Sequence, residues 1–199
     1  MSSAAKVSDS RTRCVWAGTD PAYIRYHDIE WGSPSRDDQH LFEMLVLESM
    51  QSGLSWITIL RKRENFHRAF SNFDIAAVAK YNAAKINKLL ADPGIIRNRK
   101  KIEAAVANAQ AAQRIIAEVG SLADFLWSVI GNRPLVNRWE SLSEVPAATD
   151  ESRRLAAELK QRGFQFLGPT TCYAFMQAVG MVNDHLVGCF RYRELARRK

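Results

Sequence analysis

The sequence predicts an all-α protein. Apolar residues recur at helical spacing along most of its 199 residues, and no stretch alternates apolar and polar residues long enough to require a β-strand. Residues that cap helices and residues that turn the chain divide these periodic stretches into separate segments. The composition agrees, because 47% hydrophobic and 25% charged residues are typical of a folded globular protein and not of a disordered chain.

Most of the expected helices have a recognisable start. Ser35 and Asp38 resemble a capping box that opens a helix through residues 41–48, and Gly53 ends this helix. A long alanine-rich helix is expected over about residues 98–119. The other expected helices begin at polar residues that can accept a hydrogen bond from the first turn, namely Ser55, Asp74, Asn82, Ser121 and Thr149.

The chain divides into an expected flexible extension at residues 1–13, one helical domain at residues 14–192 and a basic tail at residues 193–199. A proline-bearing connection at residues 132–146 is the expected boundary between two lobes of the domain. No apolar run reaches the roughly 18 residues that a membrane span needs, and the Met-Ser-Ser-Ala-Ala start lacks the apolar stretch of a secretory signal. We therefore expect a cytoplasmic protein without membrane contact. Separately, we expect a monomer.

Positive charge is concentrated in three places. The chain has 28 Lys and Arg against 21 Asp and Glu, a net charge of +7. A single basic cluster is often an ordinary solvated helix face. Three clusters together favour a polyanionic partner, because contacts to phosphate supply most of the sequence-independent affinity for nucleic acid. The clusters are Arg61, Lys62, Arg63 and Arg68; Arg97, Arg99, Lys100 and Lys101; and Arg191, Arg193, Arg197, Arg198 and Lys199.

The cysteines and histidines allow two interpretations. Three cysteines do not form a disulfide framework, so each is a buried thiol, a nucleophile or a metal ligand. His185 and Cys189 stand four positions apart, so both project from one face of a helical turn, and Cys14 and His27 lie near the other terminus. Two Cys and two His form a closed tetrahedral set typical of structural zinc. By spacing alone, two core thiols and two ordinary histidines remain the alternative.

Glu48 is an unusual residue for its position. Its helix is apolar on nearly every side, so the carboxyl group points into a buried region. A buried carboxylate is unfavourable unless it is paired or hydrogen-bonded. It therefore either reaches solvent or an arginine at the helix end, or serves to meet a polar or cationic ligand.

Aromatic residues are crowded near the N-terminus and after Glu48. They are ordinary core residues or, together with a buried carboxylate, the walls of a pocket for a flipped nucleobase. These residues are Trp16, Tyr23, Tyr26, Trp31 and Trp56.

The tract at residues 163–171 precedes another expected helix. Its backbone amides at a helix N-terminus, with the hydroxyl groups of Thr170 and Thr171, are suited to hold a DNA phosphate. Taken alone, the tract is equally an ordinary tight turn.

These pieces occur together and in order in one family. Over residues 13–192 the sequence resembles the 3-methyladenine DNA glycosylase I family, a branch of the helix-hairpin-helix DNA glycosylases. The motifs that carry the resemblance are Arg13-Cys14-x-Trp16, Tyr26-His27-Asp28-x-Glu30-Trp31-Gly32, Leu47-Glu48, Gly53-Leu54-Ser55-Trp56, Gly94-Ile95-Ile96-Arg97, Gly163-Phe164 and Val182-Asn183-Asp184-His185 with Cys189. Ser49 and Met50 depart from the Gly and Gln that many relatives carry, which bears on fine substrate preference.

The resemblance implies a helix-hairpin-helix glycosylase-like fold and assigns sites to it. One structural zinc ion is implied to join the N- and C-terminal segments through Cys14, His27, His185 and Cys189. The implied base pocket contains Glu48, Tyr26 and Trp56, with Trp16 and Tyr23 close by. The implied contacts to the DNA backbone come from a hairpin that includes Gly163, Gly168, Thr170 and Thr171.

The same resemblance implies base-excision repair. The expected reaction is hydrolysis of the N-glycosidic bond of N3-methyladenine in alkylated double-stranded DNA, with free 3-methyladenine as product and an abasic site left behind. We expect Glu48 to be the catalytic residue, as an anion that attracts the cationic base. No lysine stands out as a Schiff-base nucleophile, which predicts a monofunctional enzyme.

Two further points are open at this stage. Asn183 stands where many helix-hairpin-helix glycosylases place a catalytic Asp, and the adjacent Asp184 either orients His185 or caps a helix. A non-catalytic zinc-containing DNA-binding module is the alternative function, although it would not need Glu48 in an aromatic pocket. A zinc hydrolase or deaminase would need an open metal position and an H-x-E motif, which the sequence lacks.

Overall fold

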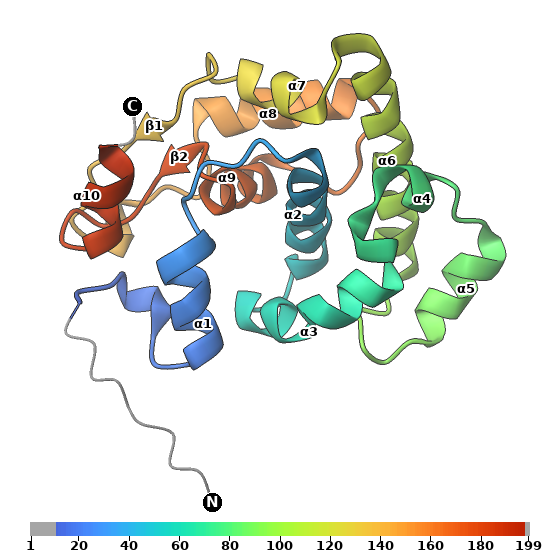
Figure 1. Cartoon of the computed structure of the whole chain (residues 1–199), viewed down its shortest axis with the longest axis horizontal. Coiled ribbons are helices and arrows are strands. Elements are labelled where there is room, and N and C mark those ends of the chain that lie inside the picture. The colour runs from blue at the N-terminus through green and yellow to red at the C-terminus, as the bar shows by residue number, and fades with distance from the viewer. Residues whose placement is uncertain (1–10, 198–199) are drawn as a thin grey trace, which may run out of the picture.

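The computed structural model describes residues 11–197, which form a predominantly helical molecule, so the expected all-α class is confirmed in its main feature (Figure 1). Residues 1–10 of the expected extension and residues 198–199 of the expected tail lie outside the described residues. The helices are α1 (Pro21–Arg25), α2 (Asp38–Gln51), α3 (Trp56–Ala69), α4 (Ile75–Ala79), α5 (Ala83–Ala91), α6 (Arg99–Val119), α7 (Leu122–Ser128), α8 (Asp150–Gln161), α9 (Pro169–Ala178) and α10 (Phe190–Ala196).

Short elements complete the fold. The strands β1 (Leu135–Val136) and β2 (Val182–Asn183) pair in parallel, and two residues each are too few for a strand pattern to be visible in the sequence. The short helical turns are η1 (Val15–Ala17), the π-helical η2 (Tyr26–Glu30), η3 (Ser71–Phe73) and η4 (Leu142–Glu144). None of the helices in the described range is long and apolar enough to cross a membrane.

Helix α2 runs through the centre of the molecule (Figure 1). Its residues 41–50 are all buried, because α3, α6, α7 and α9 pack around it. An amphipathic helix buries one stripe, whereas a helix that is apolar on every side is buried all round. The central position of α2 explains why Glu48, in its last turn, is shielded from solvent.

The start of α2 differs from the expected Ser35–Asp38 capping box. Asp37 is the N-cap, and its Oδ1 accepts a hydrogen bond from the amide of His40 at 2.7 Å. The carboxylate of Asp38 instead accepts hydrogen bonds from two amides in the first turn of α7, at 3.0 and 2.8 Å. The local motif could not reveal this because α7 lies more than eighty residues further along the chain.

Most other helix starts follow the expectation. Ser55 does precede α3, but its hydroxyl group bonds to the hydroxyl group of Thr58 and caps no backbone amide. Gly53, with φ +84°, lies just beyond the end of α2, as expected for a residue that ends a helix. Side chains that accept a backbone hydrogen bond at the expected positions are Asp74, Asn82, Ser121 and Thr149.

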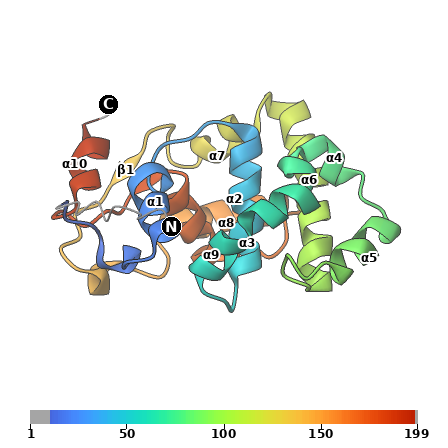
Figure 2. The ribbon, with the colours of Figure 1, turned by 60° about the horizontal axis from the view of Figure 1, so that its bottom comes forward.

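Both ends of the described chain lie at the same end of the molecule, with α5 at the other end (Figures 1 and 2). The amide of Phe190 donates a hydrogen bond to the carbonyl oxygen of Thr12 at 2.9 Å. Residues 193–196, expected in a basic tail, belong to α10, which buries Leu195. Residues 135–137 of the expected lobe boundary pair with the C-terminal segment through β1 and β2, and the division into two lobes stays a prediction.

Candidate active site and Cys/His cluster

A cavity of about 230 Å³ lies between the N-terminal segment, α2, α9 and the connection that follows β1. All five residues expected in a base pocket line it: Trp16, Tyr23, Tyr26, Glu48 and Trp56. Trp31, which the sequence offered as part of the same aromatic cluster, lines it as well. The other lining residues were not placed there by the sequence: Gln51, Leu142, Val145, Ala174, Gln177 and Asp184.

Glu48 is the most unusual residue of the cavity. Glu48 is only 5% exposed, and its carboxyl group has no hydrogen-bond or ion-pair partner among residues 11–197. Burial raises the pKa of its carboxyl group to about 8. A pKa of about 8 favours the protonated carboxyl group at neutral pH, whereas the sequence led us to expect a carboxylate.

Aromatic rings form much of the cavity wall. The ring of Trp16 lies 5.2 Å from that of Tyr23 and 4.9 Å from that of Trp31, and the rings of Tyr26 and Trp56 are 5.4 Å apart. Burial, followed by the nearby Glu48, raises the pKa of Tyr26 well above its ordinary value, so its hydroxyl group stays protonated. The wall offers ring faces for stacking and few competing charges.

The local fold of residues 20–30 supplies two sites at once. The carboxylate of Asp20 caps α1, and α1 continues directly into the π-helical η2. In η2, Tyr26 lines the cavity while the next residue, His27, belongs to a cluster of Cys and His side chains. Two adjacent residues thus connect two sites.

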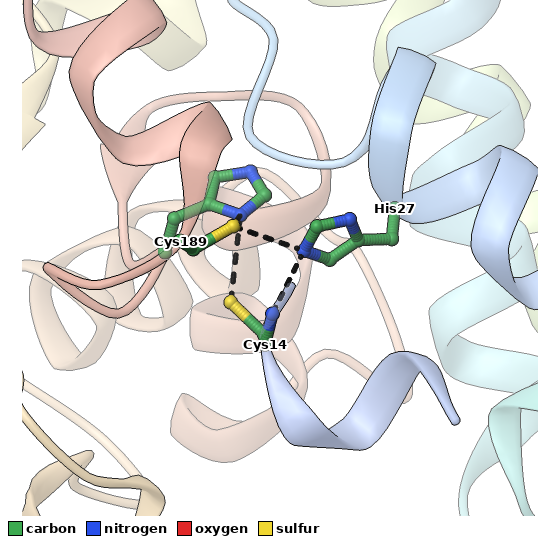
Figure 3. A group of neighbouring side chains, drawn as sticks. Cys14, His27 and Cys189 are labelled. Atoms are coloured by element: carbon green, nitrogen blue, oxygen red, sulfur yellow. Dashed lines mark hydrogen bonds between the residues drawn. The ribbon is translucent and has the colours of Figure 1, made fainter. Parts of the chain in front are cut away.

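The four expected metal ligands do come together. The buried side chains of Cys14, His27, His185 and Cys189 offer ligand atoms that all lie within 4.8 Å of one another. Figure 3 shows Cys14, His27 and Cys189 pointing toward one another. The Sγ atom of Cys189 is 3.4 Å from Nε2 of His27 and 3.6 Å from Nδ1 of His185. A tetrahedral zinc site with ordinary Zn–S and Zn–N bonds has sulfur-to-nitrogen edges of about 3.5 Å, so the donor set fits a zinc ion.

Hydrogen bonds to residues outside the cluster orient both of its imidazole rings. His27 donates from Nδ1 to the carboxylate of Asp28 at 2.8 Å, and Asp28 pairs with Arg13. His185 donates from Nε2 to the carbonyl oxygen of Trp31 at 3.1 Å. Each ring therefore presents its other nitrogen to the cluster, an arrangement typical of metal-binding histidines.

Asp184 performs neither of the roles expected for it. Within residues 11–197 its carboxylate forms no hydrogen bond with an imidazole and caps no helix, but accepts four side-chain hydrogen bonds in the cavity wall. The donors are Asn137 at 2.6 Å, Trp139 at 2.8 Å, Tyr173 at 2.5 Å and Gln177 at 2.8 Å. Asn137 and Trp139 lie more than forty residues from Asp184 in the sequence, so no local signal pointed to their contacts with it.

The expected DNA-contact tract joins two packed helices, α8 and α9. Gly163 has φ +92°, and Gly168 and Pro169 begin α9. The tract is held against α6 through Asn108, which accepts a hydrogen bond from the amide of Gln165 at 2.7 Å. The start of α9 and its Thr170 are exposed, while the middle of the same helix lines the cavity.

Each basic cluster contributes at least one residue to contacts within the protein; in the first cluster Arg61 pairs with Asp20 and Lys62 donates to the carbonyl oxygens of residues 93 and 94. Arg63 donates to Glu43 and to Glu30, both at 2.6 Å, and so ties η2 to α2. Lys101 donates to two carbonyl oxygens at the end of α2, at 3.0 and 2.7 Å. Arg191 is buried and donates to a serine hydroxyl group at 2.6 Å. Only the exposed residues of the clusters are therefore available to contact a polyanion.

Comparisons with known proteins agree on one family. The family model "Methyladenine glycosylase" matches residues 16–192. DNA-3-methyladenine glycosylase 1 of Escherichia coli K12 is 48% identical over 90% of this chain and 96% of its own length, and a Haemophilus influenzae DNA-3-methyladenine glycosylase is 48% identical over 89% and 96%.

Solved structures extend the match to the fold. A crystal structure of 3-methyladenine DNA glycosylase I has a TM-score of 0.88 at 48% identity and covers 90% of this chain and 98% of that protein. The Staphylococcus aureus enzyme, solved to show how it recognises 3-methyladenine, has a TM-score of 0.87 at 40% identity and covers 92% and 97%. The chain therefore belongs to the methyladenine glycosylase family.

Proposed function

We propose that this chain hydrolyses the N-glycosidic bond of N3-methyladenine in alkylated double-stranded DNA, releasing 3-methyladenine and leaving an abasic site. The observation that carries the proposal is a buried carboxyl group, Glu48, that faces an aromatic cavity without a hydrogen-bond or ion-pair partner among the described residues. A buried polar group is normally paired with the protein or with ordered water. We infer that the partner of Glu48 in the working enzyme is a ligand, and the names of the relatives indicate which one.

The charge of the damaged base explains how little catalysis is needed. N3-methyladenine is cationic in DNA, so its glycosidic bond is weak and the base leaves as a neutral molecule. A cation beside Glu48 lowers the pKa of the carboxyl group, because opposite charges favour ionisation. Glu48 then accepts hydrogen bonds from the adenine edge as a carboxylate and stabilises the cationic base.

The aromatic wall adds selectivity for the same base. Tyr26 and Trp56 provide ring faces for stacking and for cation–π attraction, which is strongest in a site shielded from water. Normal adenine carries no charge and gains less from both Glu48 and the rings. The cavity, at about 230 Å³, also suits a single base more than the larger ligands of about 300–1,000 Å³ sites.

We propose that α8, residues 162–168 and α9 act as the helix-hairpin-helix element that grips the DNA backbone. The first amides of α9 are unpaired within the helix and attract a phosphate. Gly163 and Gly168 let the backbone approach closely, and the hydroxyl groups of Thr170 and Thr171 lie in the first turn of α9. Exposed basic residues would supply the remaining phosphate contacts.

We further propose that Cys14, His27, His185 and Cys189 hold one structural zinc ion. Four protein ligands close the coordination sphere, so no position is open for a reactive water. When bound, the ion crosslinks the N-terminal segment to the C-terminal segment. We expect the protein to act as a monomer in the cytoplasm, and no chemical step requires the metal.

The decisive experiment is to incubate the protein with methylated DNA and to identify the released bases by mass spectrometry. We expect release of 3-methyladenine, and E48Q should lower single-turnover release about 10- to 100-fold, the range for losing a hydrogen bond to a charged group. E103Q, which changes an exposed glutamate of α6, is the matched control and should release the base normally.

Two outcomes would contradict the proposal. If the folded wild-type protein released no 3-methyladenine but still bound DNA, it would be a non-catalytic zinc-containing DNA-binding module. Trapping of a covalent complex by borohydride would show a Schiff-base intermediate and refute the monofunctional mechanism.

A further inference from the structure

One wall of the cavity is a segment that forms few hydrogen bonds with the rest of the described protein. Residues 137–145, called here the strap, follow β1 and bring Leu142 and Val145 to the cavity. The strap begins alongside the C-terminal segment, where the amide of Asn137 donates to the carbonyl oxygen of Asn183 at 3.2 Å. Its first residues are therefore held by backbone hydrogen bonds.

Beyond Trp139 the strap makes only local hydrogen bonds within the described part of the chain. Glu144 accepts from the amide of Glu140 at 3.0 Å and from the hydroxyl group of Ser141 at 3.1 Å. These hydrogen bonds shape the strap but do not attach it to the rest of the protein. Val145 packs against the hydrophobic core, whereas Leu142 is 42% exposed. The position of Leu142 therefore depends on how firmly residues 137–139 are held, and that of Val145 depends on them and on its core packing.

Asp184 binds both the first residues of the strap and helix α9. Its Oδ1 accepts hydrogen bonds from the side chains of Asn137 and Trp139, which belong to the strap. Its Oδ2 accepts hydrogen bonds from Tyr173 and Gln177, which belong to α9. Each carboxylate oxygen is hydrogen-bonded to a different wall of the cavity, so the carboxylate fixes the distance between the strap and α9.

The four hydrogen bonds also limit what Asp184 can do chemically. A carboxylate has about four lone-pair positions, and the four donors use that number. Asp184 is 3% exposed and has no free position from which to take a proton from water. It is therefore unsuited to be the general base, although it lines the cavity beside the place where related glycosylases are expected to carry one.

We infer that Asp184 is a positioning residue that fixes the strap against α9 and so sets the width of the base pocket. The inference rests on the proposed function, because it concerns the site that receives the methylated base. A firmly held wall rejects a larger purine by steric clash, whereas a loosened wall binds the correct base less well and discriminates less. The strap residues Leu142 and Val145 then contribute to base selection.

The test uses W139F, which removes one hydrogen bond to Asp184 and keeps an aromatic ring at a half-buried position. The probe is free 3-methyladenine, titrated by calorimetry into the full-length, metal-loaded protein, with 3-methylguanine as the larger competitor. We expect W139F to bind 3-methyladenine about tenfold more weakly, a loss of about 1.4 kcal/mol, and to discriminate less against 3-methylguanine. The single-turnover rate at saturating enzyme should stay within about twofold of wild type.

A matched control distinguishes a change in the base pocket from a general loss of stability of the protein. W127F makes the same chemical change at a tryptophan whose Nε1 donates to the carbonyl oxygen of Ser35 at 2.9 Å, outside the cavity. W127F should leave the affinity for 3-methyladenine unchanged. Melting temperature and bound zinc are measured for every variant, so that a change in folding is detected separately.

A double-mutant cycle decides whether Trp139 acts through Asp184. In a D184N background, W139F should cause little further loss of affinity, because the shared contact is already weakened. Equal losses in both backgrounds, or wild-type affinity in W139F, would overturn the inference. A wild-type protein that binds no 3-methyladenine would instead overturn the proposed function, so the two failures are distinguishable.

Discussion

Replacing Glu48 by Gln should make the folded protein more stable at neutral pH. Glutamine has nearly the same shape as glutamic acid but cannot ionise. Glu48 is buried in the centre of the fold without a cationic partner among the described residues, and its pKa is raised from 4.5 to about 8. The unfolded chain loses this proton above about pH 4.5, whereas the folded protein keeps it up to about pH 8.

The sign and size of the effect follow from this difference. A raised pKa in the folded state gives stability that is fully present below pH 4.5 and is lost as the pH rises towards 8. At pH 7 the loss covers about 2.5 pH units at about 1.36 kcal/mol per unit, or roughly 3 kcal/mol. E48Q lacks this loss, so its advantage over wild type should grow from near zero at pH 4.5 to about 3 kcal/mol at pH 7.

Urea unfolding of wild type and E48Q at several pH values between 4.5 and 8 measures this advantage. Glu43, on the same helix, is the contrasting control. Although burial alone would raise its pKa, hydrogen bonds from His40 and Arg63 lower it to about 2. Glu43 therefore stabilises the fold above pH 4.5, and E43Q should lose stability at neutral pH. An E48Q advantage that does not change with pH would refute the assignment of a raised pKa.

Three further predictions concern the scaffold. K101M leaves two carbonyl oxygens at the end of α2 without their donor and should lower the free energy of unfolding by about 1–3 kcal/mol in urea. G180A should lower the melting temperature or abolish soluble expression, because its Cβ would lie 2.3 Å from the backbone nitrogen of Pro34. Wild type should carry about one zinc per chain by mass spectrometry of metals, and C189A should lose it and melt at lower temperature.

The sequence predicts the helices well where the signal is local. Asp74, Asn82, Ser121 and Thr149 cap their helices as expected, because a cap and its amide partner lie within one turn of each other. Prediction fails where the partner is distant. Asp38 looks like part of a capping box, but its carboxylate caps α7 in another part of the fold.

The functional site was likewise predictable from local sequence signals and unpredictable where contacts are distant in sequence. Glu48 and the aromatic residues around it could be singled out because a carboxyl group on an apolar helix and a crowd of rings are visible in the sequence. The strap could not be singled out, and Asp184 was given the wrong roles, since the hydrogen bonds that join them span more than forty residues of sequence. The protonation of Glu48 also depends on the whole fold, because it follows from how completely α2 is surrounded.

The Cys/His cluster and the base pocket are joined by the chain itself. Cys14 lies two residues from Trp16, His27 adjoins Tyr26, and His185 donates to the carbonyl oxygen of Trp31. These three neighbours line the cavity. Loss of the metal in C189A should therefore weaken binding of 3-methyladenine more than a remote change that lowers the melting temperature equally. Equal binding in C189A and such a variant would show that the ion stabilises the fold without shaping the pocket.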